Sequence, residues 1–440
     1  MTFVQILNEY TVLIAALMVL VFFIGLRLGY VRGGWNRHLV YLWSLIVYAI
    51  YVLITPLFFY FDQQYLIIGT DIRDYYGIGF AFNVAGVVCF ILGYWIANIN
   101  KKDLWQEPPV YDIKNPHKII TILFYSLYAI VLFNLAIGGA NIQQVFIGNE
   151  VVGLGASGGS YFLQNFTDSL ICVIVIAYFY DIPGRILLFW IAISFFLFSI
   201  LGFRYRIVLS LFGILFVYLY KNEVSVKRIA VGGLLALLFF YGIMFSTENR
   251  RTLIMKTYNE LNFDPLSYEY GKFFDQTRGA LPDMAVYKLY DNPNRNPQHD
   301  YGLTMFGYVF IRMIPRAIYP DKDRFYPPPQ LATTLQAYDA WWARFSGEAT
   351  LSVAAFYIAF GWLGVVFGHF FWGVFLRRFA NTIRRQDKLQ VASYIVVALA
   401  TFQWITRGYF PQVIDHFVYM MIPIWIIRFL SRKSKLSEIH

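Results

Sequence analysis

Nine side chains stand out as candidates for chemistry because of their type and because they lie at or beyond the ends of apolar runs. Seven are arginines, and a glutamate and a histidine complete the set: Arg204, Arg206, Arg250, Arg251, Arg312, Arg316, Arg407, Glu348 and His299. A guanidinium stays charged and binds phosphate oxygens through two parallel N–H donors. A carboxylate or an imidazole can accept a proton near neutral pH. The set therefore predicts a site for an anion such as a pyrophosphate, with a base available.

The elements that position these residues are long apolar segments. The chain has 440 residues, of which 58% are hydrophobic and only 14% charged, whereas a soluble domain is nearer a quarter charged. The continuous runs of about twenty residues predict helices and not a barrel. We predict an all-α polytopic membrane protein with about eleven spans: 9–28, 39–59, 78–99, 118–137, 162–181, 185–201, 204–220, 228–247, 349–374, 391–406 and 412–430.

Lys and Arg orient these spans. Alternate short connections are rich in basic residues, which predicts that they face the cytoplasm. The connections 60–77 and 138–161 are not, so we expect them outside together with the N-terminus, while the C-terminus is inside. One membrane domain results, with spans 1–8 in 1–247, a large, mostly helical periplasmic loop at 248–348 and spans 9–11 in 349–440. Residues 301–314 are apolar but too short to span and predict a re-entrant or interfacial helix.

The predicted topology explains the formal net charge of +10. Most of the excess lies at the predicted cytoplasmic face, where it meets anionic lipid, and the long loop has 12 acidic and 12 basic residues. Nucleic acid is therefore not an expected partner. Cys89 and Cys172 both fall inside predicted spans, so neither a disulfide framework nor a cysteine metal site is expected. The sequence has no P-loop, no HExxH and no cysteine cluster.

Each candidate also has a purely structural interpretation. Arg204 and Arg206 either enter the outer leaflet and line a polar cavity, or snorkel from a span end. The other arginines either converge on one outer pocket or pair with the acids of the loop. Glu348 either caps the ninth span or acts as a general base or orienting group. His299 either is solvated in its Asn-Pro turn or acts as the base.

The interiors of the spans argue for an enzyme. They contain almost no ionisable residues, with Asp168 as the main exception. Ion-coupled carriers usually place charged groups near the middle of the membrane. This chain instead places its charges at the predicted outer ends of the spans, which favours an enzyme acting on a membrane-anchored substrate.

Three motifs resemble those of the Wzy-type O-antigen and polysaccharide repeat-unit polymerases. They are Arg204-Tyr-Arg206, the stretch from Arg312-Met-Ile-Pro-Arg316 to Pro320-Asp321-Lys322, and Ser346-Gly347-Glu348 leading to Phe360-Gly361-x-x-Gly364. The resemblance implies a GT-C-like glycosyltransferase of the bacterial inner membrane. It would need no metal or other cofactor, and it would transfer a glycan from undecaprenyl pyrophosphate to an incoming lipid-linked repeat unit. A chain-length regulator and a flippase are the implied protein partners.

The resemblance also suggests roles for the candidates. The arginines would neutralise the pyrophosphate, Glu348 or His299 would take the acceptor's proton, and loop aromatics would stack on sugar rings. Two alternatives remain. An O-antigen ligase, which transfers finished glycan to lipid A–core, has a similar architecture. A flippase or exporter of lipid-linked sugars would instead have a charged cavity open alternately to both faces.

Overall fold

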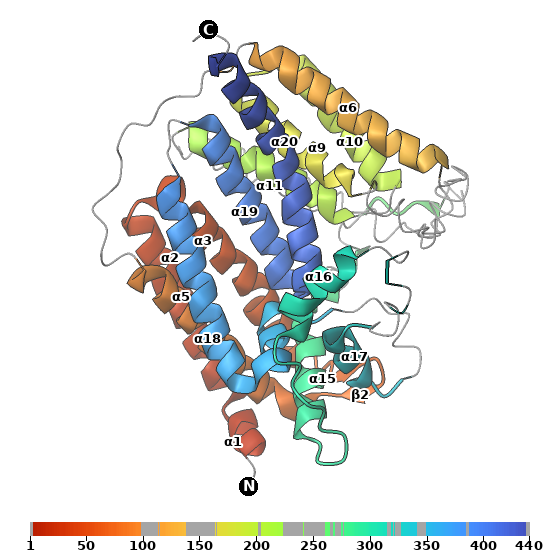
Figure 1. Ribbon diagram of the computed structural model, residues 1–440. Helices are drawn as coiled ribbons and strands as arrows, with labels where there is room; N and C mark the ends of the chain where they lie inside the picture. Colours follow the sequence, from red (N-terminus) through yellow and green to blue (C-terminus); the bar gives the residue numbers. More distant parts are fainter. Residues whose placement is uncertain are drawn as a thin grey trace. The chain divides into compact units, whose positions relative to one another are not determined.

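The computed structural model is nearly all helical (Figure 1). It describes residues 3–97, 113, 115–137, 163, 165–200, 204–222, 241, 260–264, 267–268, 274–275, 277–314, 318–319, 321, 327–340, 349–383 and 387–436. The chain divides into two compact units. The first comprises Met1–Pro109, Thr277–Arg385 and Tyr394–Val418, and the second comprises Val110–Gln276, Gln386–Ser393 and Tyr419–His440.

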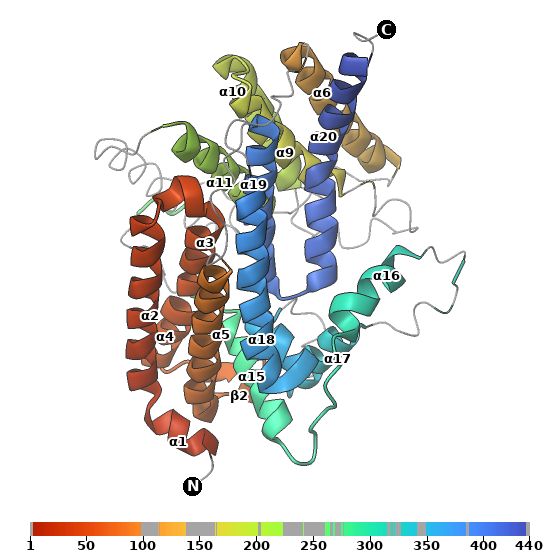
Figure 2. The ribbon, with the colours of Figure 1, turned by 60° about the vertical axis from the view of Figure 1, so that its left-hand side comes forward.

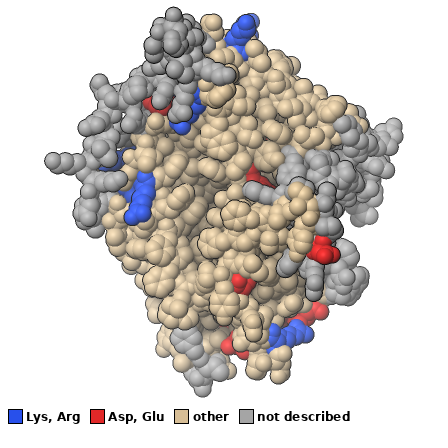
Figure 3. All heavy atoms as spheres, in the orientation of Figure 1, with Lys and Arg blue, Asp and Glu red and all other residues tan. Residues whose placement is uncertain are grey.

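The predicted class, an all-α membrane protein, agrees with the helices found. Within the described residues, seven helices are long and apolar enough to cross a membrane: Thr11–Val31, Arg37–Phe61, Arg73–Ile96, Pro116–Ala136, Ser352–Thr382, Lys388–Arg407 and Phe410–Ser431. Each coincides with a predicted span. The wide areas without charged side chains in Figure 3, among the residues described, suit contact with lipid.

The number of spans remains a prediction. The expected spans at 162–181 and 185–201 coincide with shorter apolar helices, Phe166–Phe179 and Gly184–Phe198. The expected span at 204–220 coincides with a helix that begins at Arg204 and ends at Lys221. The expected span at 228–247 lies, except for residue 241, outside the described residues.

Four helices of the first unit pack side by side (Figures 1 and 2): α2 (Thr11–Val31), α3 (Gly34–Tyr48), α5 (Tyr76–Ile96) and α18 (Ser352–Thr382). The backbones of α5 and α18 touch, because a side chain at Gly93 would overlap the carbonyl oxygen of Phe370. A side chain at Gly373 would likewise overlap the carbonyl oxygen of Phe90. Glycines at these positions let two membrane helices approach this closely.

Short elements lie before, between and after these helices. They are α1 (Phe3–Glu9), the π-helical η1 (Ala49–Ile54), α4 (Thr55–Phe61), η2 (Arg73–Tyr75) and the hairpin of β1 (Leu66–Ile67) and β2 (Thr70–Asp71). The predicted loop contributes α15 (Ala280–Asp291), η5 (Leu303–Gly307), α16 (Tyr308–Met313) and α17 (Pro329–Gln336). An apolar helix thus occurs where a re-entrant or interfacial one is expected, and its position in the membrane remains a prediction.

Contacts within the first unit place several connections at one end of the bundle. The Lys288 ammonium of α15 donates a hydrogen bond to the carbonyl oxygen of Asp71 at 2.8 Å, and the Tyr75 hydroxyl donates to the Asp291 carboxylate at 2.8 Å. Helix α1 packs against α5 and η2 at the same end. These contacts group the N-terminus, the connection 60–77 and part of the long loop at one end of the bundle, and the side of the membrane that this end faces stays a prediction.

The second unit is built around α9 (Phe166–Phe179). It packs against α6 (Pro116–Ile137), α10 (Gly184–Ile200) and α11 (Arg204–Lys221). Every residue from Leu170 to Ala177 is buried, as expected of a helix that is apolar on all sides. Helices α19 (Lys388–Arg407) and α20 (Phe410–Leu436) each have residues in both units.

Candidate functional site

A junction in the first unit joins the loop helices to the last three spans. The side chain of Gln330, at the start of α17, is buried, and its amide nitrogen donates to the carbonyl oxygen of Gly408 at 2.9 Å and to Thr350 Oγ1 at 3.3 Å. The backbone N–H of Gln330 donates to Thr304 Oγ1 at 3.0 Å. Because buried polar groups are nearly always paired, this one residue ties together α17, η5, the segment before α18 and the α19–α20 turn.

Apolar packing supports the same junction. Met305 of η5, Ala355 and Ala359 of α18, Trp404 of α19 and Val413 of α20 form one buried cluster. Phe410 and Phe356 pack against it. A loop element is therefore held against the ends of α18, α19 and α20, so that side chains on η5 and α16 lie near those ends.

The junction carries two of the predicted anion-binding arginines. Arg312, near the end of α16, forms a 3.1 Å ion pair with Asp415 of α20, and these side chains are 20% and 17% exposed. Arg407 is the last residue of α19, is exposed, and directly precedes Gly408, whose carbonyl Gln330 holds. Partial exposure leaves both arginines accessible to an anionic ligand.

Arg206 lies in the second unit. Its side chain is 3% exposed, and Nε donates to Oδ1 of Asp168 at 2.5 Å. Asp168 is the main ionisable residue inside the predicted spans, and its carboxylate lies in the first turn of α9, where the helix dipole stabilises negative charge. The guanidinium lies 5.3 Å from the ring centre of Tyr205. Arg206 is thus held by a buried carboxylate from a neighbouring helix.

His299 contacts a break in α18. The helix is interrupted at Phe360 and Gly361, where Gly361 has φ +64° and ψ −152°. The backbone N–H groups of Asp300 and Tyr301 donate to the carbonyl oxygens of Ile358 and Ala359 at 3.1 and 3.0 Å. His299 Nδ1 donates to the same Ile358 oxygen at 3.3 Å. The segment 299–301 therefore supplies the donors that the interrupted helix lacks.

This break explains the Phe360-Gly361-x-x-Gly364 motif. A backbone with the dihedral angles of Gly361 is open essentially to glycine alone, and a Cβ there would also lie 3.2 Å from His299 Nε2. A side chain at Gly364 would overlap the carbonyl oxygen of Phe356. The His299 ring stacks on Tyr290, with centroids 4.8 Å apart. Its Nε2 is the nitrogen left to exchange a proton.

Asp283 is a functional candidate that sequence reasoning missed. Its side chain is buried, and Oδ1 accepts a 2.8 Å hydrogen bond from the backbone N–H of Leu351, the residue that caps α18. Burial raises the carboxyl's pKa to about 8, although hydrogen bonds from the backbone of Leu351 and Ala354 oppose the shift. The spacing of Asp283, Tyr287 and Tyr290 on one helix face was a usable signal.

The remaining candidates cannot be placed. Arg250, Arg251, Arg316 and Glu348 lie outside the described residues, and Arg204 is described only as the first residue of α11. Whether Glu348 caps the ninth span or acts in catalysis therefore stays a prediction. Among the described residues, no group of three or more His, Cys, Asp or Glu could hold a metal ion.

Comparison with known families bears on the C-terminal helices. Residues 350–435 match the family model of the O-antigen polysaccharide polymerase Wzy. The resemblance to Wzy-type polymerases is confirmed. The matched segment contains α18 with its break, α19 with Arg407, and α20 with Asp415, so the family similarity includes one side of the junction. No curated protein and no solved structure matches the chain in the corresponding comparisons.

The Wzy match shows similarity to an O-antigen polymerase in general terms, and the seven described helices that are long and apolar enough to cross a membrane agree with it. The matched residues 350–435 do not include Arg206, Arg312 or His299. The roles of these residues therefore rest on the contacts described above.

Proposed function

We propose that the chain polymerises undecaprenyl-pyrophosphate-linked oligosaccharide repeat units on the periplasmic face of the bacterial inner membrane. The Wzy match over residues 350–435 is the observation that carries this proposal. The partly exposed arginines at the ends of the matched helices add to it, because a substrate with a membrane-embedded lipid and a pyrophosphate needs cations at that level.

The proposed reaction needs no covalent bond between the protein and the substrate. A hydroxyl of the acceptor sugar attacks the anomeric carbon of the donor, the bond from that carbon to the phosphate oxygen breaks, and undecaprenyl pyrophosphate leaves. Arg312 and Arg407 offset the charge that develops on the leaving group, and Arg204, Arg206, Arg250, Arg251 and Arg316 complete the predicted set. Arginine supplies this charge in a metal-independent, GT-C-like glycosyltransferase.

The acceptor hydroxyl must lose a proton as the new bond forms. Glu348 and His299 are the proposed bases. His299 can use only Nε2 for this, because its Nδ1 donates to the carbonyl oxygen of Ile358. Glu348 lies two residues before Thr350, whose hydroxyl accepts from Gln330 in the junction.

The proposed topology has the N-terminus in the periplasm and the C-terminus in the cytoplasm. It is supported by the shared bundle end of α1, the hairpin and α15 within the first unit. Donor and acceptor lipid-linked oligosaccharides are the proposed substrates, with a flippase delivering them and a chain-length regulator setting the product's size. No nucleic acid takes part.

A genetic experiment tests this function. A strain lacking the gene should attach single repeat units to its lipid A–core, and the intact gene should restore a ladder of long chains. Arg204→Ala and Arg316→Ala should insert normally into the membrane yet fail to restore the ladder. Arg185→Ala, which removes an exposed arginine, is a matched control and should restore the ladder. Long glycan left on its lipid carrier in the deletion strain would identify a ligase instead.

A further inference from the structure

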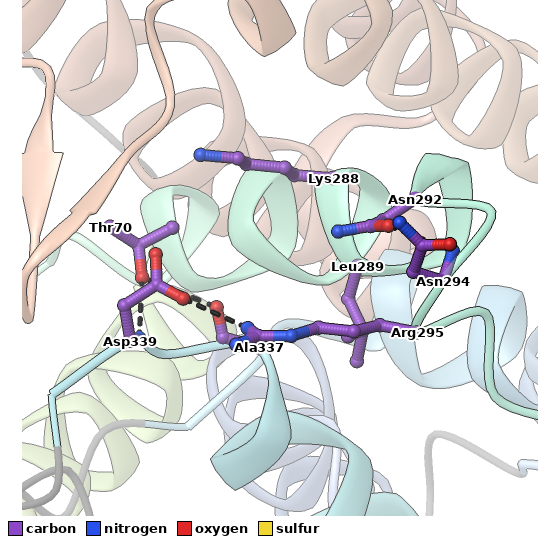
Figure 4. A pocket seen from close by; sticks show the side chains of 8 residues that line it. All are labelled: Thr70, Lys288, Leu289, Asn292, Asn294, Arg295, Ala337 and Asp339. Carbon is purple, nitrogen blue, oxygen red and sulfur yellow. Dashed lines mark hydrogen bonds and ion pairs between the residues drawn. The ribbon is translucent and has the colours of Figure 1, made fainter.

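A polar cavity lies at the end of the first unit where α15, the β1–β2 hairpin and the end of α17 meet. Its volume is about 400 Å³, within the range of small-ligand sites. Figure 4 shows Arg295 reaching across it toward Asp339, with Asn292 and Asn294 on one side and Thr70 on the other. The cavity is distinct from the junction that carries Arg312 and Arg407.

The walls of the cavity are joined across the fold. Thr70 Oγ1 accepts from the backbone N–H of Asp339 at 2.9 Å and donates to the carbonyl oxygen of Ala337 at 3.3 Å. Lys288 Nζ donates to the carbonyl oxygen of Asp71 at 2.8 Å. Three segments far apart in the sequence are thus fixed together, so the cavity exists before a ligand binds.

The cavity contains hydrogen-bond donors and acceptors side by side. Arg295 Nη1 and Asp339 Oδ1 form a 2.9 Å ion pair, and these side chains are 56% and 47% exposed. Asn292 Oδ1 accepts from the backbone N–H of Asn294 at 3.0 Å. Within the described part of the chain, no protein group bonds to the side-chain amide of Asn294. Leu289 and Ala337 add apolar surface beside these polar groups.

This combination fits a sugar ring. Adjacent hydroxyls of a sugar each donate and accept, so a neighbouring guanidinium and carboxylate satisfy both at once. The C–H face of the ring needs a small apolar wall of the kind that Leu289 provides. The ion pair is also too exposed to contribute much to stability, since such pairs are worth at most about 1 kcal/mol.

We propose that this cavity is a saccharide subsite, in which Arg295, Asp339 and the Asn294 amide hold vicinal hydroxyls of one sugar unit of the glycan. The proposal deepens the proposed polymerase function and rests on it for the identity of the glycan. The subsite holds the substrate away from the pyrophosphate, so it selects the sugar without taking part in bond breaking.

Saturation-transfer NMR on the full chain in detergent micelles tests the subsite. The probe is the repeat-unit oligosaccharide released by hydrolysis from the source bacterium's own surface polysaccharide. The wild type should bind it, and Arg295→Ala and Asp339→Ala should each raise Kd about tenfold or more, the factor typical of a lost hydrogen bond to a charged group. Lys221→Gln, which breaks the exposed ion pair with Asp181, is the matched control and should leave Kd unchanged.

Two results would overturn the subsite: no binding of the oligosaccharide to the wild type, or unchanged Kd in folded Arg295→Ala and Asp339→Ala. If either variant fails to fold, Asn294→Ala replaces it, because that exposed side chain can be removed without opening the core. Different results would reject the polymerase function. Binding that depends on Arg295 without chain extension by the wild type would reject the polymerase and keep the subsite. Chain extension by the wild type, together with an unchanged KM for the oligosaccharide substrate in Arg295→Ala and Asp339→Ala, would keep the polymerase function and reject the subsite.

Discussion

Replacement of Asp283 tests how the long loop is attached to the span that follows it. Its carboxylate, on α15, accepts the backbone N–H of Leu351 at 2.8 Å where α18 begins. In Asp283→Ala this N–H loses its partner in a buried place. Loss of a helix cap or of a buried acceptor costs about 1–3 kcal/mol. In Asp283→Asn, an amide oxygen can take over the same hydrogen bond without a charge.

The pH dependence follows from the pKa of the same carboxyl. Burial raises it from 3.8 to about 8, so between these values the folded chain holds a proton that the unfolded chain has lost. The free energy of unfolding therefore falls as pH rises through this window, by up to about 1.4 kcal/mol per pH unit from this group alone. Asp283→Asn cannot titrate and should lack this slope.

Thermal unfolding in detergent, followed by tryptophan fluorescence from pH 5 to pH 8, measures both effects. Asp283→Ala should have the lowest apparent Tm at pH 5. The apparent Tm of the wild type should fall relative to that of Asp283→Asn as pH rises. Parallel curves for the wild type and Asp283→Asn would refute the raised pKa, and an unchanged Tm for Asp283→Ala would refute the cap.

Three further predictions concern other parts of the chain. Asp168→Ala should lower the free energy of unfolding by about 3–5 kcal/mol, because it leaves Arg206 buried without its carboxylate; a loss below about 1 kcal/mol in denaturant titration would contradict this. Gly361→Ala should lower the free energy of unfolding by about 1–3 kcal/mol through backbone strain, which a lower apparent Tm will show. Gly184→Ala is the control and should leave the apparent Tm unchanged, because a Cβ there meets nothing within 4 Å. Arg312→Ala should reduce kcat/KM for chain extension about tenfold or more while Arg312→Lys retains part of it, and equal loss in both would favour a purely geometric role.

The parts of the fold that depend on local composition could be predicted. Seven expected spans coincide with candidate membrane helices because each is a continuous apolar run. Charge alternation between connections predicts that α1, the hairpin and α15 face the same side of the membrane; contacts within the first unit group them at one end, and the side they face stays a prediction. These features need only hydropathy, helix signals and the distribution of Lys and Arg.

The candidate site was harder to predict because its contacts join distant segments. The Phe360-Gly361-x-x-Gly364 motif was visible, but nothing local showed that residues 299–301 would occupy the resulting break. Arg206 and Asp168 were both singled out, yet their pairing depends on how α9 and α11 pack. Gln330 gave no signal, since one amide among many polar loop residues has no distinctive spacing.

The most direct test of the proposed function uses the purified chain in lipid nanodiscs with a single lipid-linked repeat unit as donor and acceptor. Product length is read by gel and mass spectrometry, and released undecaprenyl pyrophosphate is quantified in the same reaction. A polymerase should make a ladder of lipid-linked oligomers and release one undecaprenyl pyrophosphate for each bond formed, without any other protein. Unchanged single-repeat substrate after incubation with folded protein, or its movement across the bilayer without new glycosidic bonds, would contradict the proposal.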